Sequence, residues 1–158
     1  MVMGGIPFYL SLIDPRQSLV QNVDRLFFSH GGIMRGEFDE LYNALFSNAE
    51  LYISVVKALA QHHDGMTRTE ISKVIGANGG TLTRVLTNLE RCDFISRSQN
   101  FGCKTKDTIY RLMDFYTLFY YKFIAQDTSG DEQWWSHNFE SRLVSTWQGL
   151  TFEIVCLM

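Results

Sequence analysis

Residues 67–91, TRTEISKVIGANGGTLTRVLTNLER, decide the fold, because two helical patterns flank a glycine-rich turn. Thr67 and Glu70 have capping-box spacing, in which each side chain accepts a hydrogen bond from the other residue's backbone N–H. The helix that they begin is short and is expected to end at Gly76. A second helix is predicted over Thr81–Arg91. Two short helices joined by such a turn are typical of a helix-turn-helix.

The helix predicted over Thr81–Arg91 has an apolar side and a polar side. At about 100° per residue, its apolar residues gather on one side: Leu82, Val85, Leu86 and Leu89. The candidate DNA- or partner-binding residues of this helix are Thr81, Thr83, Arg84, Thr87, Asn88 and Arg91. Cations, hydroxyls and amides are the groups that contact phosphates and base edges. A solvated helix face has the same composition, so the pattern leaves both interpretations open.

A hairpin is expected after this helix. Residues 94–98 and 108–112 alternate as strands do, and Lys104 and Lys106 lie in the tip between them. Two strands alone are marginally stable, so this wing must pack on the helices. Its candidate binding residues are Arg97, Lys104 and Lys106.

A further helix is predicted before the turn motif. Asn48 can cap it with its side chain, and the helix ends before Gly65, which suits a left-handed backbone position. Residues 48–112 therefore predict a winged-helix domain, a module that usually binds DNA or a partner protein.

Positive charge is concentrated in this module. Residues 66–111 hold eight Lys and Arg against four Asp and Glu, a net charge of +4, whereas the whole chain carries −3. Phosphate contact requires such a local excess. A dedicated DNA-binding domain is usually more basic, so a partner protein remains an alternative.

Composition excludes several classes of protein. The chain has 158 residues, of which 46% are hydrophobic, and no apolar run approaches the roughly 20 residues of a membrane helix. Cys92, Cys103 and Cys156 lack zinc-site spacing and indicate free thiols in a reducing, cytoplasmic compartment. No nucleophile–base pair or metal set can be assembled, so we expect neither an enzyme nor a cofactor in this chain.

The flanking segments are predicted to be helical. Residues 1–47 contain three short helices, which start near Pro7, Leu19 and Glu37 and resemble a small lid-like bundle. The predicted fold is therefore mainly α, with α+β character only at the wing.

In residues 113–158, Asp114 can cap an aromatic helix over 115–125 that is apolar on every side and should form the centre of the core. An amphipathic helix from Trp134 through Trp147 and another from Gly149 are expected to follow. The last pattern is still apolar at the final residue, which indicates a truncated further domain.

A family resemblance follows from several short motifs. Residues 4–10, GGIPFYL, resemble the G-G-x-P-x-Y-L segment in the helical lid of archaeal-type P-loop ATPases of the STAND/AAA+-like class. The order of the elements that follow is also similar. A Glu-rich helix over 37–46 comes first, then a winged helix, and then Tyr110–Asp114 before Phe119-Tyr120. Trp147-x-Gly149-x-x-Phe152-Glu153 looks like the opening helix of a nuclease-like domain.

The resemblance implies a non-catalytic regulatory fragment of an ATPase. ATP and Mg²⁺ would then belong to the parent protein, whose ATPase core would be an intramolecular partner, because no G-x-x-x-x-G-K-[ST] loop exists in this chain. The winged helix would contact double-stranded DNA or a partner domain. The alternative is a stand-alone winged-helix DNA-binding transcription regulator, which could be a homodimer through its aromatic helix, with no membrane partner.

Overall fold

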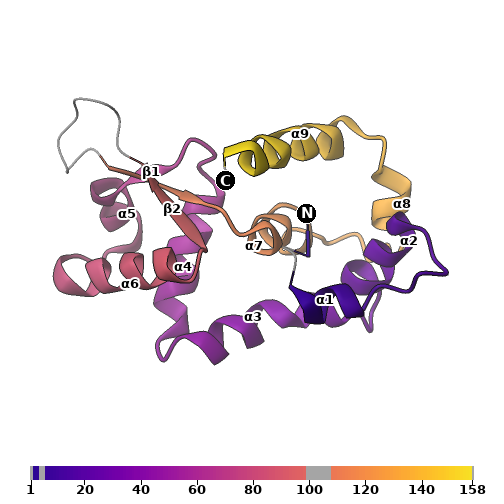
Figure 1. The fold of residues 1–158 in the computed structure, drawn as a ribbon, viewed down its shortest axis with the longest axis horizontal. Helices are drawn as coiled ribbons and strands as arrows, with labels where there is room; N and C mark the ends of the chain where they lie inside the picture. The colour runs from indigo at the N-terminus through magenta and orange to yellow at the C-terminus, as the bar shows by residue number, and fades with distance from the viewer. Residues whose placement is uncertain (1, 4–5, 99–107, 158) are drawn as a thin grey trace.

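The molecule is mainly helical, with a small antiparallel sheet at one end, so the predicted fold class is confirmed (Figure 1). The computed structural model describes residues 2–3, 6–98 and 108–157. In chain order the elements are α1 Pro7–Ser11, α2 Leu19–Val23, the π-helical turn η1 Asp24–Phe28, α3 Ile33–Leu45, α4 Ala49–Ala60, β1 Met66–Thr67, α5 Arg68–Ile75, α6 Gly79–Arg91, β2 Ile95–Ser98, β3 Ile109–Leu112, α7 Phe115–Phe119, the π-helical turn η3 Tyr120–Ile124, α8 Trp134–Asn138 and α9 Arg142–Leu157.

The helix-turn-helix forms largely as its local sequence dictates. Thr67 and Glu70 make the predicted capping box, with the Thr67 N–H donating to Glu70 Oε2 at 2.7 Å and the Glu70 N–H to Thr67 Oγ1 at 3.3 Å. Gly76 ends α5 with φ +69°, as predicted. The next helix, α6, begins at Gly79 rather than Thr81, so part of the expected turn is helical. The predicted Asn48 cap is wrong, because its side chain makes no capping hydrogen bond to α4.

The wing contains one strand more than expected. The order of the sheet is β1-β3-β2, with both pairings antiparallel. Tyr110 of β3 pairs with Met66 of β1 on one side and with Arg97 of β2 on the other. The two-residue strand β1 thus ties the wing to the start of α5. Residues 99–107, which include Lys104 and Lys106, lie outside the described residues.

The N-terminal segment forms the expected helices with one shifted start. Pro7 lies in the first turn of α1, whereas α3 begins at Ile33 instead of Glu37. The turn η1 buries Leu26, Phe27 and Phe28 together, although they are consecutive. Helices α1 and α2 lie at the end of the molecule opposite the sheet, and α3 runs from that end toward α4 (Figure 1).

The aromatic helix, α7 with η3, lies at the centre of the core, as predicted (Figure 1). Asp114 caps it by accepting a hydrogen bond from the Thr117 N–H at 2.7 Å. Phe119 is fully buried, and its ring contacts those of Phe27 and Trp135 at centroid distances of 4.8 and 5.2 Å. The expectation that every side is buried is wrong at Lys122, which is exposed.

The predicted boundaries of the last two helices are wrong. The chain leaves the helix after Asn138, and α9 then runs without a break through Gly149. The break forms where Ser141 Oγ accepts a hydrogen bond from the Val144 N–H at 3.3 Å at the start of α9. At the other end of α8, the buried Asp24 carboxylate accepts hydrogen bonds from the backbone N–H groups of Trp135 at 2.8 Å and Ser136 at 3.2 Å. No helix in the described ranges combines the length and apolar character that crossing a membrane requires.

Asp114 makes stability depend on pH. Burial raises the pKa of its carboxyl, although the hydrogen bonds from Thr117 act in the opposite direction. A raised pKa means that the folded chain holds this proton more tightly than the unfolded chain does, so stability falls as pH rises through the interval above the ordinary value of about 3.9. We therefore expect Asp114→Asn, which keeps an oxygen for the cap, to gain stability relative to the parent chain as pH rises from 3 to 7. Urea unfolding at several pH values measures this difference, and a difference that moves the other way would contradict the prediction.

Candidate nucleic-acid interface

The predicted orientation of α6 is confirmed. Its apolar residues Leu82, Val85, Leu86 and Leu89 are at most 2% exposed. They pack toward α4 and β2, which are among the neighbours of α6. The opposite side of this helix therefore faces away from the core.

Two arginines dominate the outward side of α6. Arg84 and Arg91 are both exposed and stand two helical turns apart, a rise of about 10 Å. Thr87 lies between them and is half-buried, while Thr81 is exposed near the start of the helix. A cation at each end with a hydroxyl between them can contact two phosphates and a base edge.

Arg68, which the sequence did not single out, joins this surface from α5. Its Nη2 donates to the Gly79 carbonyl oxygen at 2.8 Å and to Thr83 Oγ1 at 2.9 Å. The Thr83 hydroxyl also donates to the Gly79 carbonyl oxygen at 3.1 Å, so this candidate residue holds the first turn of α6. A cation in the first turn of α5 is unfavourable toward the helix dipole, and that signal could have identified Arg68.

Asn88 turns away from the outward side. Its Nδ2 donates to the Tyr52 hydroxyl at 2.8 Å, and the residue is half-buried against α4. The structure thus does not bring this amide together with Arg84 and Arg91. The helical period did not predict this, because Asn88 lies at the edge of the polar side of α6. There the contact with Tyr52 of α4 determines where the side chain points.

The wing contributes one described cation. Arg97 on β2 lies next to the end of α6, and its Nε is 3.4 Å from Glu90 Oε1. Both side chains are more than a third exposed, so water screens this ion pair and it stabilises the fold little. Arg97 therefore remains accessible to a phosphate. The candidates Lys104 and Lys106 cannot be placed, because they lie outside the described residues.

The described residues offer this surface no metal chemistry. In the ranges 2–3, 6–98 and 108–157, no three His, Cys, Asp or Glu side chains come together in a way that could hold a metal ion. Cys92 and Cys156 are exposed free thiols. What the surface presents is an arginine-rich helix beside a sheet, with positive charge and hydrogen-bond donors.

A family model, described as MarR family, matches residues 54–101. The match runs from α4 through the helix-turn-helix and beyond β2, so it covers the interface but a minority of the chain. No curated protein and no solved structure matches the chain.

The match corrects the resemblance to P-loop ATPases. The motifs that suggested an ATPase lid and a nuclease-like helix lie outside residues 54–101, and no finding indicates a P-loop ATPase. The winged helix is instead similar to that of a family of transcription regulators. No finding therefore supports an ATPase core as a partner, or the ATP and Mg²⁺ that the resemblance implied for a parent protein.

Proposed function

We propose that this chain is a DNA-binding transcription regulator that places α6 in the major groove of duplex DNA. The observation that carries the proposal is the orientation of α6, whose leucines are buried while Arg84 and Arg91 face outward. The MarR family match over the same residues supports it, because MarR regulators bind double-stranded DNA.

The dimensions of α6 suit this role. A helix with its side chains is about 10–12 Å across, and the major groove is about 12 Å wide. With the apolar side against α4, the outward side would meet the base edges through Arg84 and Thr87. Arg68, at the first turn of α6, and Arg91, at the last, would then contact the phosphates on either side.

The distribution of charge supports the same contact. The net charge of +4 over residues 66–111 opposes that of the rest of an otherwise acidic chain. Duplex DNA would therefore be attracted to this end of the molecule and repelled by the other. Binding should weaken steeply with salt, because each neutralised phosphate releases counterions.

We also propose that the regulator acts as a homodimer, as MarR regulators typically do. The aromatic helix expected to make this contact is used within the chain, where Tyr116 and Phe119 are at most 1% exposed. The exposed apolar residues Phe152 and Val155 of α9 offer a better surface. Light scattering after size-exclusion chromatography measures the molar mass in solution and so tests the dimer. The cytoplasmic location of the chain stays a prediction.

Arg84→Ala and Arg91→Ala should each weaken DNA binding by about 1–3 kcal/mol, because each removes a charged donor from the groove-facing side. Fluorescence anisotropy with a labelled duplex pool of random sequence, at low salt, measures the affinity. Arg16→Ala is the matched control, since it removes the same charge from an exposed position between α1 and α2, at the opposite end from α6 (Figure 1).

The control should bind like the parent chain, and raising the salt concentration should weaken all of these complexes. The absence of binding at low salt would overturn the proposed function. An equal loss in Arg16→Ala would show that net charge alone, and not α6, attracts DNA.

A further inference from the structure

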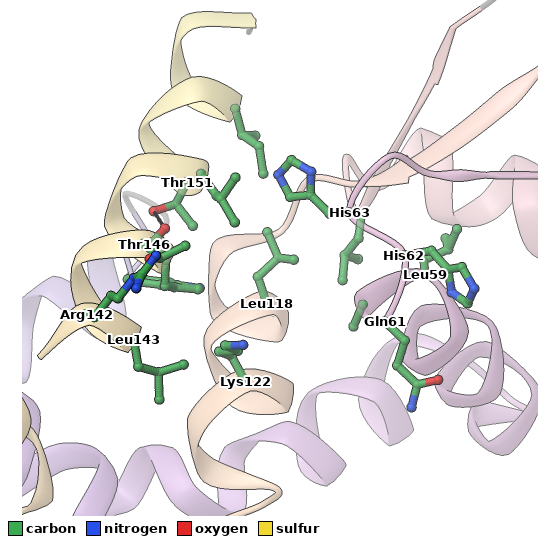
Figure 2. Close-up of a pocket in the computed structure, with 15 residues that line it drawn as sticks. Leu59, Gln61, His62, His63, Leu118, Lys122, Arg142, Leu143, Thr146 and Thr151 are labelled. Carbon is green, nitrogen blue, oxygen red and sulfur yellow. Dashed lines mark hydrogen bonds between the residues drawn. The ribbon is translucent and has the colours of Figure 1, made fainter.

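A cavity of about 550 Å³ lies between α9, the end of α4 and the aromatic helix formed by α7 and η3, here called the central helix (Figure 2). Leu118 and Lys122 of the central helix stand between α9 on one side and the residues that follow α4 on the other (Figure 2). Cavities of this size are typical of sites for small organic ligands. Residues of α6 do not line it, so the proposed DNA contact leaves this cavity unused.

The wall of the cavity is mainly aliphatic. Its leucines and isoleucine come from α4, β3, the central helix and α9: Leu59, Leu112, Leu118, Leu143, Leu150 and Ile154. Trp147 is the one Phe, Tyr or Trp side chain among the described lining residues. An aliphatic wall imposes no stacking geometry, so it suits a flexible alkyl chain better than a flat ring system.

The permanently charged side chains among the described lining residues, Lys122 and Arg142, are both basic. Lys122 reaches the cavity from the central helix and Arg142 from the first turn of α9, and both residues are exposed. His62 and His63 line the side that follows α4 (Figure 2). None of the described lining residues is acidic, and the exposed Asp64 beside His63 lies outside the lining. Ammonium and guanidinium groups bind carboxylates through charge-assisted hydrogen bonds.

We propose that this cavity binds a medium-chain alkyl carboxylate. Its chain lies among Leu118, Leu143 and Leu150, and its carboxylate lies at the rim between Lys122 and Arg142. Charge complementarity selects an anion, and the aliphatic wall selects its apolar body. The proposal does not depend on DNA binding, because it can be tested on the free protein.

Isothermal titration calorimetry with octanoate, hexanoate, acetate and octanamide tests the site. Octanoate should bind saturably with a Kd below about 1 mM. Each CH₂ removed from the chain should weaken binding about fourfold, so acetate should show no measurable binding. Octanamide has the same shape without the charge and should bind at least about tenfold more weakly than octanoate.

Variants locate the binding in this cavity. Lys122→Gln and Arg142→Gln should each weaken octanoate binding about fivefold to tenfold, while Arg16→Gln, a matched loss of charge far from the cavity, should leave it unchanged. Leu150→Trp should fill the cavity and abolish binding, with circular dichroism checking that the fold is kept. The proposal would be overturned if octanoate showed no saturable binding, if octanamide bound equally well, or if Arg16→Gln weakened binding as much as the rim variants.

Discussion

Phe119→Ala should lower the free energy of unfolding by about 3–5 kcal/mol, one of the largest effects expected for a single substitution in this chain. Phe119 is fully buried, and its ring lies within 4.8–5.4 Å, between centroids, of the rings of Phe27, Phe123, Trp135 and Trp147. These neighbours come from η1, η3, α8 and α9, which cannot all collapse into the space that the phenyl ring leaves. The loss therefore includes the transfer of the ring to water and the cavity that remains.

Urea unfolding followed by tryptophan fluorescence measures this loss. Phe8→Ala is the matched control, because Phe8 is 57% exposed and its truncation should cost less than about 1 kcal/mol. If both variants lose the same stability, the ring of Phe119 is not the centre of the core. A single transition with an unchanged slope would further show that the helices around Phe119 unfold together.

The sequence predicted well those features that depend on neighbouring residues in the chain. The capping box of Thr67 and Glu70 needs residues three positions apart, and the buried side of α6 needs only the helical period. Asp114 caps α7 for the same reason. In each case the partner is within one turn of helix, so the residue types and their spacing determine the contact.

Features that depend on distant contacts were missed. The buried Asp24 binds the start of α8 across 111 residues, and the two-residue strand β1 exists only because β3 lies beside it. Asn88 points to Tyr52 across 36 residues rather than outward. Such contacts are set by how the elements pack, which no local pattern encodes.

The candidate site was predicted only in part, because some of its residues are placed by local periodicity and others by contacts between distant elements. Arg84 and Arg91 face outward because the period of α6 places them opposite its leucines. Arg68 joins them only through the packing of α5 on the start of α6. Its one signal in the sequence was a cation in the first turn of a predicted helix, where the helix dipole disfavours positive charge. The motifs that suggested an ATPase were short and lay outside the winged helix, so their order alone was misleading.

Gly65→Ala should destabilise the fold by about 2–6 kcal/mol, because strain and overpacking add at this position. Gly65 has φ +85°, a conformation that an L side chain rarely adopts. A Cβ there would also lie 2.7 Å from the Tyr110 carbonyl oxygen and 2.6 Å from Ile109 Cγ2, both on β3. The loop after α4 crosses β3 at this point, where the Arg111 Nε donates to the Asp64 carbonyl oxygen at 3.0 Å. An alanine would therefore push the wing away from α4.

The matched control separates strain from contact. Gly76 has φ +69° with open space around it, so Gly76→Ala should cost only the strain of a left-handed residue, about 1–2 kcal/mol. Urea unfolding measures both variants, and hydrogen exchange should show faster exchange at the β1–β3 pairing in Gly65→Ala alone. Equal losses in the two variants would mean that the loop can move away from β3 without cost. The proposed interface would then need no close crossing at Gly65, because α6 and the wing would keep their arrangement without it.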